Sequence, residues 1–190
     1  NPLPVELTTF EVAADGSDAI LTWQTASETN NAGFYVEQRE PNGTFAALGF
    51  VEGAGTTNQV QSYRFRAEAV GYGEQAFRLR QVDTDGTASL SDVQTVRTTP
   101  EAAVAVSAYP NPFGNGQPAR ITVTPKETQA VTVDVFDLLG RRVTRLYDGR
   151  LEASDSKTLT FSGARHASGV YFVRVTGERF QTTTRLSLLR

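Results

Sequence analysis

The chain has 190 residues, with 18 Lys and Arg against 21 Asp and Glu, and a formal net charge of −3 at pH 7. This balance gives no basic footprint for nucleic acid or for an anionic membrane surface. The sequence contains no Cys, which excludes disulfide bonds and thiolate metal sites, and no apolar run is long enough for a transmembrane helix. Because it contains no Met and starts at Asn1, we expect a processed piece of a longer protein.

The first half of the chain predicts β-strands with very little helix, because short segments rich in Val, Thr, Phe and Tyr alternate in polarity. Asn42-Gly43 predicts a hairpin with a type I′ turn, since both central residues of that turn need positive φ. Trp23 falls on the second strand, where a sandwich normally has a core residue. The expected strands cover residues 5–12, 19–24, 33–40, 45–52, 61–67, 74–83 and 87–96.

The second half restarts the alternation after a short connector. Residues 99–108 include small side chains and Pro100, which cannot donate to a β-ladder, and they predict a linker. The fold class is therefore expected to be all-β, with two consecutive immunoglobulin-like β-sandwich domains at 1–98 and 109–190. The strands expected beyond Pro100 cover residues 104–108, 120–124, 131–136, 142–147, 157–161, 170–176 and 179–189.

Two loops carry residues that suggest chemistry. His166, the only histidine, allows a hydrolytic triad to be drawn with Ser168 and Asp155, but no nucleophile elbow or oxyanion loop accompanies it. Residues 83–86 (Asp-Thr-Asp-Gly) resemble the start of a calcium loop, but Gln94 stands where an EF-hand loop has its bidentate Glu. A solvated loop histidine and a hairpin turn are the favoured interpretations, and a weak surface calcium site stays open.

Glu28 and Glu37 can be paired on paper as glycosidase carboxylates, but they belong to a loop and a strand of a small sandwich without an evident cleft. Trp23 can be imagined as a sugar-stacking platform, and its place on the second strand favours the core instead. We therefore predict no catalytic, cofactor-binding or metal-binding residue, no cofactor and no enzyme activity in this chain.

Three segments of the first half form a recognisable pattern: Leu21-Thr22-Trp23, Phe34-Tyr35-Val36-Glu37 and the strand from Phe77 to Asp83. With this pattern the first half resembles a fibronectin type III domain. The stretch from Trp23 to Asn31 is similar to the variant that often precedes type IX sorting domains. Phe77 stands where the sixth strand usually has its Tyr. The candidates for a tyrosine-corner hydrogen bond are therefore Tyr63 and Tyr72.

The second half contains four patches in a fixed order: Tyr109 to Phe113, Val135 to Val143, Ser168 to Val175, and Thr184 to Arg190. Together they resemble the C-terminal sorting domain (type A) of the type IX secretion system, over residues 109–190. Each patch alone reads as ordinary turns and strands, and it is their joint occurrence that carries the resemblance. The sorting-motif residues that the resemblance implies are Tyr109, Pro110, Asn111, Pro112, Phe113, Leu139, Gly140, Arg141, Gly169, Val170, Tyr171, Arg185, Leu186, Leu188 and Arg190.

The resemblance implies the non-catalytic C-terminal portion of a secreted or cell-surface protein of a Gram-negative bacterium, exported through the periplasm and the outer membrane. The implied partners are the type IX translocon and a sortase-like peptidase, with a cut between Pro100 and Tyr109, where a small-residue linker suits proteolysis. Attachment of the cargo to surface lipopolysaccharide, or its release, would follow. Residues 1–98 are expected to be a spacer or an interaction module. The alternative is a surface adhesion, carbohydrate-binding or filament-forming module.

The final predicted strand, Phe180 to Leu189, ends at the chain terminus. One of its edges is therefore expected to be free to pair with a receptor strand by β-strand addition. Arg185 and Arg190 would add charge to that contact.

Overall fold

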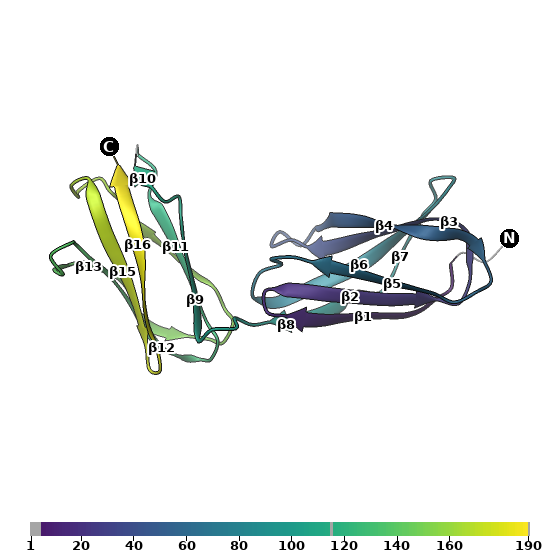
Figure 1. The fold of residues 1–190 in the computed structure, drawn as a ribbon, viewed down its shortest axis with the longest axis horizontal. Coiled ribbons are helices and arrows are strands. Elements are labelled where there is room, and N and C mark those ends of the chain that lie inside the picture. Colours follow the sequence, from purple (N-terminus) through teal and green to yellow (C-terminus); the bar gives the residue numbers. More distant parts are fainter. Residues whose placement is uncertain (1–4, 115, 190) are drawn as a thin grey trace. The chain divides into compact units, whose positions relative to one another are not determined.

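A computed structural model describes residues 5–114 and 116–189 of the chain (Figure 1). The chain divides into two compact units, Asn1–Thr98 and Thr99–Arg190, and each has its own hydrophobic core. The described residues form strands, turns and loops without any helix, so the predicted all-β fold class is confirmed.

The N-terminal unit is a sandwich of two antiparallel sheets. One sheet has the order β1-β2-β5; the other has the order β4-β3-β6-β7, with β8 also paired to β6. The strands are β1 (Leu7–Asp15), β2 (Asp18–Thr25), β3 (Glu28–Arg39), β4 (Phe45–Thr57), β5 (Gln61–Ala67), β6 (Gly73–Asp83), β7 (Ala88–Leu90) and β8 (Gln94–Thr98).

Alternation explains the core of this unit, because every second residue of a strand points between the sheets. Leu21 and Trp23 of β2 are buried in this way, and Trp23 is only 1% exposed. The indole stacks on Tyr63 at 5.4 Å between ring centroids and meets the edge of Phe34 at 5.5 Å. The prediction that Trp23 is a core residue is therefore confirmed, and no sugar-stacking face is left on it.

The strand expected at 87–96 is interrupted. Ser91 donates its backbone N–H to the carbonyl of Leu79, while its hydroxyl accepts from the Leu79 N–H. One residue therefore satisfies both backbone groups of Leu79, and Asp92 and Val93 bulge out before pairing resumes at Gln94, opposite Phe77.

The prediction of a type I′ turn at Asn42-Gly43 is wrong. Gly43 has φ +90° and donates its N–H to the carbonyl of Glu40, but Asn42 is not in the positive-φ region. Pro41 fixes φ near −65° at the first central position, which suits a type I turn followed by a glycine in the left-handed region. The loop thus has three residues instead of two.

The C-terminal unit repeats this architecture. Its sheets have the orders β9-β11-β14 and β13-β12-β15-β16-β10, so β12 and β15 take the places that β3 and β6 hold in the first unit (Figure 1). The strands are β9 (Val104–Tyr109), β10 (Phe113–Gly114), β11 (Ala119–Pro125), β12 (Gln129–Phe136), β13 (Arg142–Leu151), β14 (Lys157–Phe161), β15 (Gly169–Gly177) and β16 (Gln181–Leu189).

The connector between the units is shorter than the linker expected at 99–108. Strand β9 already begins at Val104 and pairs with β11 from Val104, opposite Pro125, to Tyr109, opposite Arg120. Only residues 99–103 lie between β8 and β9. The stretch 104–108, which the sequence placed both in the linker and in an expected strand, belongs to β9 and is partly buried.

Candidate functional site

The sorting-motif patches meet at one end of the C-terminal unit, which we call the motif end. Pairing places Gly169 opposite Leu188, and Leu188 also lies beside Phe113 of β10. Phe136 lies opposite Phe172, so the β12–β13 turn projects from the same end. The chain terminus and β10 share this end in Figure 1. Patches that are up to 76 residues apart in the chain, such as Asn111 and Ser187, are therefore in contact.

The first patch carries the chain from one sheet to the other. Strand β9 belongs to the sheet of β11, whereas β10, four residues further on, pairs in parallel with β16. The Tyr109–Pro110 and Asn111–Pro112 peptide bonds are both cis. Phe113 is 3% exposed, and its ring lies 5.7 Å from that of Phe161 in the core. The Pro-rich segment thus connects the two sheets, and the buried ring of Phe113 fixes its end in the core.

Asn111 clamps the edge of β16 with its side chain. Its Nδ2 donates to the carbonyl of Arg185 at 2.8 Å, and its Oδ1 accepts from the N–H of Ser187 at 3.0 Å. These two bonds copy the pattern that a neighbouring strand would make. The side chain of Asn111 therefore supplies the hydrogen bonds that a neighbouring strand would otherwise make, at a point where the flanking Pro residues have no N–H to donate.

The Leu-Gly-Arg patch is the tip of the β12–β13 hairpin. Gly140 has φ +76° and donates to the carbonyl of Asp137. The Asp137 carboxylate accepts from the N–H groups of Leu139 and Arg141 and from Nε of Arg141, at 2.8–3.0 Å. Burial acts to raise the pKa of Asp137, but the Arg141 and Leu139 donors outweigh it and hold that pKa below its usual value. Gly140 and Arg141 thus build the turn, and they present Leu138 and Leu139 at its tip.

The Ser-Gly-Val-Tyr patch starts β15 with a tyrosine corner. The Tyr171 hydroxyl donates to the carbonyl of Ala167, four residues upstream, at 2.7 Å, and its ring is buried. The Tyr171 and Phe161 rings meet edge to face, and the His166 imidazole stacks on Phe161 with centroids 5.0 Å apart. In the first unit, the candidate Tyr63 forms no such corner, because it donates its hydroxyl to Glu28.

The last patch alternates along β16. Leu186 and Leu188 are buried in the core, whereas Arg185 lies exposed on the outer face of the sheet. Val170 lies opposite Ser187 on the same outer face and is half-buried. Arg190 lies outside the described residues.

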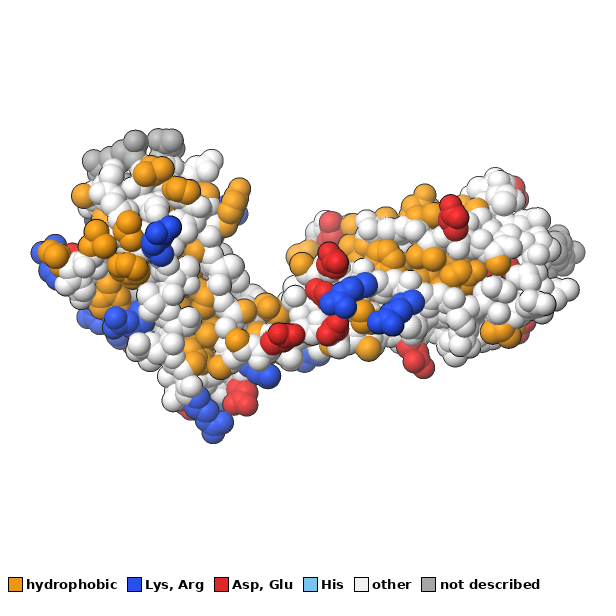
Figure 2. All heavy atoms as spheres, viewed as in Figure 1, with side chains coloured by type: hydrophobic (Ala, Val, Ile, Leu, Met, Phe, Trp, Pro, Cys, Tyr) orange, Lys and Arg blue, Asp and Glu red, His pale blue; other side chains and the backbone are white. Residues whose placement is uncertain are grey.

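Among the described residues of this unit, four large apolar side chains are exposed, and all belong to the motif end. The exposed fractions are 79% for Tyr109, 67% for Leu138, 79% for Leu139 and 57% for Leu189. Figure 2 shows hydrophobic side chains on the surface at this end of the unit. Large exposed apolar patches on a protein often mark an interaction surface. The motif end therefore combines a rigid frame with accessible apolar side chains.

The hydrolytic triad drawn from the sequence is not assembled. His166 stacks in the aromatic cluster at the motif end, beyond Phe161. Asp155 precedes Lys157 at the other end of β14. At residues 83–86, Gly86 donates to the carbonyl of Asp83 in a hairpin turn, as favoured from the sequence. Within the described ranges, no group of three or more His, Cys, Asp and Glu side chains that could hold a metal ion is found.

The two carboxylates considered as a glycosidase pair are both held by structural contacts. Glu28 accepts from Thr25, Asn31, Tyr63 and the Ala54 N–H at 2.6–2.9 Å. Glu37 accepts from Nε of two arginines of β6 at 2.7–2.8 Å. Both oxygens of Glu28 are therefore saturated by donors, and both oxygens of Glu37 are held in ion pairs, so the two carboxylates have structural roles.

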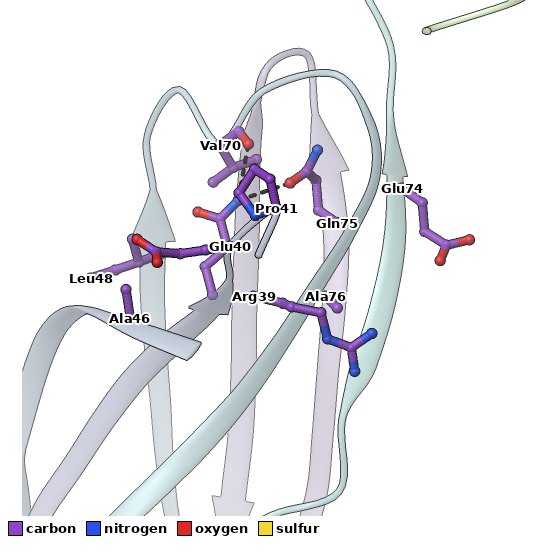
Figure 3. A pocket seen from close by; sticks show the side chains of 10 residues that line it. Arg39, Glu40, Pro41, Ala46, Leu48, Val70, Glu74, Gln75 and Ala76 are labelled. Carbon is purple, nitrogen blue, oxygen red and sulfur yellow. Dashed lines mark hydrogen bonds between the residues drawn. The ribbon is translucent and has the colours of Figure 1, made fainter. Parts of the chain in front are cut away.

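A pocket of about 460 Å³ in the N-terminal unit lies beneath the β3–β4 turn (Figure 3). Its Gln38 amide donates to Gln75 and to the carbonyl of Val70. Figure 3 shows the carboxylates of Glu40 and Glu74 pointing away from each other. Ligand sites need a few convergent polar groups, so this pocket does not present one.

Sequence reasoning missed the residues that support the motif patches. Asp137 organises the β12–β13 turn, and Phe161 and the Ala167 carbonyl hold Tyr171. Asp137 had a readable signal, because Asp137-x-x-Gly140 repeats the spacing of Asp83-x-x-Gly86. The contact between Phe161 and Tyr171 had none, since it joins two strands in different sheets.

Comparison with protein families matches residues 107–188 to the model described as "Secretion system C-terminal sorting domain". Comparison with curated protein sequences gives no significant match. The described part of the chain has no helix that is long and apolar enough to cross a membrane.

Solved structures similar to the chain include dimeric latent PorU from Porphyromonas gingivalis, with 15% identity, 98% of this chain and 20% of that chain covered, and a TM-score of 0.39. Another is the FN1–FN3 domains of chicken CNTN1, with 15% identity, 98% and 66% of the two chains covered, and a TM-score of 0.45. A third is the BSP domain of a biofilm associated protein, at 13% identity, 96% and 29% coverage, and a TM-score of 0.32. The chain spans about a fifth of the PorU chain.

The match to the family model spans β9 to β16 and includes all four motif patches. The unit before it has the sheet order of a fibronectin type III-like sandwich. Such a sorting domain directs its protein to the cell surface or into the medium through the outer membrane. Residues 107–188 of this chain are therefore a C-terminal sorting domain of the type IX secretion system, and they follow a β-sandwich with the sheet order described above.

Proposed function

We propose that the motif end is the surface that the type IX translocon reads, and that the sorting-motif residues divide into two groups. One group builds the frame: Asn111, Phe113, Gly140, Tyr171, Leu186 and Leu188 are buried, bonded or required by a turn. The other group is accessible: Tyr109, Leu139 and Arg185. Arg141 belongs to both groups, because it bonds Asp137 in the turn and its side chain is 75% exposed. The single observation that carries the proposal is the convergence of all four patches on this end.

The test is a reporter protein with an inner-membrane signal, fused in front of the whole chain and expressed in a type IX-competent host. We expect Tyr109→Ser and Leu139→Ser to reduce export of the reporter without changing the melting temperature, because both side chains are 79% exposed. The matched control is Arg179→Ser, whose side chain is 82% exposed in the β15–β16 turn at the other end of the unit. If the parent fusion is retained in both the competent strain and a translocon-deficient strain, the C-terminal unit is not the export signal.

The proposed cleavage site lies in residues 99–103. A cut between Val104 and Tyr109, as allowed by the sequence, would break β9 inside its sheet. Glu101, Ala102 and Ala103 are exposed, which suits a peptidase. A sortase-like peptidase would remove the sorting domain there, and surface lipopolysaccharide would be the acceptor of the cargo. Mass spectrometry of the exported reporter should find its new C-terminus within 99–103, and a terminus inside β9 would contradict the proposal.

The first unit is proposed to be a spacer or an interaction module. One observation favours interaction: Phe50, Tyr35, Arg80 and Leu90 form a continuous row across β4, β3, β6 and β7 on the outer face of the sheet. The Tyr35 and Phe50 rings are 4.8 Å apart, Arg80 lies over Tyr35 at 4.2 Å, and Phe50 and Leu90 are 43% and 56% exposed. This row is where adhesion, glycan binding or self-association would occur.

The interaction role of the first unit is tested on the purified chain by a glycan array, for glycan binding, and by sedimentation velocity, for self-association. Phe50→Ser should remove any binding or association that the parent shows, and Val60→Ser, at another apolar position that is 65% exposed, should not. Identical behaviour of both variants leaves the unit as a spacer.

A further inference from the structure

Strand β16 has an open edge over its first half. Asn111 bonds the Arg185 carbonyl and the Ser187 N–H from the side opposite β15. Backbone groups alternate in direction along a strand, so the N–H and C=O of Thr183 also point away from β15. Among the described residues, no strand or side chain pairs with these two groups of Thr183.

The opposite edge of the same sheet is protected and this one is not. Strand β13 has two register shifts against β12, between Val133 and Asp134 and between Val135 and Phe136. Such irregularities twist an edge away from added strands. The β15–β16 ladder runs from Gln181 to Leu188 without a shift. A flat, regular edge is the form that accepts another strand.

The open stretch has a defined end. Phe113 and Gly114 of β10 pair with Leu188 and Leu189, and the Asn111 clamp covers the segment just before them. The edge is therefore not free to the terminus, as the sequence suggested. It is free from Gln181 to the N–H of Arg185, which is room for one short strand.

The side chains beside this edge define the partner. Arg185 and Arg174 lie exposed on the outer face, and neither forms an ion pair with a described residue; Arg174 rests on Phe136 with Cζ 4.4 Å from the ring centroid. On the inner face, Thr182 and Thr184 are half-buried and point between the sheets. Residues 99–190 contain 12 Lys and Arg against 8 Asp and Glu, and Figure 2 shows blue side chains predominating on the visible surface of this unit.

We propose that Gln181–Arg185 is a docking edge for one added β-strand of a translocon protein, with acidic residues on its solvent side and small apolar residues on its inner side. Directly opposed unlike charges stabilise a strand pair, so a carboxylate facing Arg185 sets the register. Backbone pairing supplies affinity and alternate side chains supply specificity. This inference rests on the proposed function, because the partner is the protein that reads the motif end.

Export tests the backbone part of the proposal. Thr183→Pro removes the outward N–H, and proline is tolerated where an edge N–H faces solvent; Thr183→Ala keeps that N–H and is the matched control. We expect export of the Thr183→Pro fusion to fall about tenfold, the effect of losing roughly one good hydrogen bond, while Thr183→Ala is exported like the parent. Parental export of a folded Thr183→Pro fusion overturns the proposal. If Thr183→Pro does not fold, Arg185→Glu against Arg179→Glu takes its place, and equal export of those two overturns it.

A peptide titration tests the docking edge independently of the proposed export function. The purified chain is titrated with acetyl-Val-Glu-Val-Glu-Val-Glu-Val amide and with its Lys counterpart, and backbone amide shifts are followed by NMR. We expect shifts at Thr183 and Arg185 with the Glu peptide, and binding about tenfold weaker or more with the Lys peptide. The absence of shifts on β16, or equal binding of both peptides, overturns the docking edge. If the parent fusion is not exported, the proposed export function fails, and the peptide titration alone tests whether β16 has a docking edge.

Discussion

At the residue scale, the strongest polar feature is the buried carboxylate of Glu28. It is fully buried, and each of its oxygens accepts two hydrogen bonds. The donors come from four strands: Thr25 from β2, Asn31 from β3, the Ala54 N–H from β4, and Tyr63 from β5. Burial and the nearby Glu28 raise the pKa of Tyr63, so its phenol stays protonated and remains a donor.

The first prediction concerns Glu28→Gln. The amide of the variant places a donor against groups that already donate, which leaves buried polar atoms without partners. We expect the free energy of unfolding to fall by about 2–3 kcal/mol. Urea denaturation at pH 7 measures it, with exposed Glu11→Gln as the control. A variant as stable as the control would show that the four bonds contribute little.

The second prediction concerns pH. Burial acts to raise the pKa of both Glu28 and Glu37, but the Tyr63, Asn31 and Thr25 donors at Glu28, and Arg80 and Arg78 at Glu37, outweigh it. Both folded pKa values therefore lie below the ordinary 4.5. The stabilisation is complete above that value and is lost as the pH falls through the folded pKa values.

Urea midpoints measured between pH 7 and pH 3 test this dependence. The parent should lose stability below about pH 4.5, and Glu28→Gln should lose less over the same interval because one of the two carboxylates is gone. Equal slopes for the two proteins would assign the acid sensitivity to other groups.

At the element scale, one turn recurs in three hairpins. At Gly43, Gly86 and Gly140 the glycine has positive φ and donates to the carbonyl three residues earlier. The strands on either side were predictable from alternation, because each hairpin buries one face. The turn class at Gly43 was mispredicted, because the Glu40 N–H bonds the carbonyl of Thr44 and so closes a three-residue loop, in which Pro41 suits the first position.

The third prediction concerns Gly140→Ala. No atom lies within 4 Å of an added Cβ, so the cost comes from the backbone alone, at φ +76°. We expect a loss of about 1 kcal/mol, because an L-residue is strained in the left-handed region. Gly43→Ala, with φ +90° and equally open space, is the matched variant and should lose a similar amount. Thermal unfolding measures the loss of stability in both variants. A loss well above the expected value in either one would contradict the explanation from backbone strain.

At the scale of the whole molecule, each unit has its own core. Val36 is fully buried in the first and Val133 in the second. The charges also divide, because residues 1–98 contain 6 Arg against 13 Asp and Glu, whereas the second unit is basic. The modest net charge of the chain conceals this division, so a basic surface on the sorting domain was not apparent from the composition of the whole.

The fourth prediction follows from the two cores. Val36→Ala and Val133→Ala each remove two buried methyl groups, and each should destabilise its own unit by about 2 kcal/mol. Scanning calorimetry of the whole chain should show two transitions, and each variant should lower only one of them. A single transition lowered by both variants would show that the units unfold together.

The sequence by itself determined the all-β class, most of the strands and the sorting family, because alternation and short motifs are local properties of the chain. It also placed Trp23 in the core, since the second strand of a sandwich is central. Tertiary structure decided what the motifs do. Asn111 clamps β16, and Tyr171 closes a corner against Ala167, through contacts whose partners the motifs do not specify. The open edge at Thr183 likewise exists only because β10 is too short to cover it.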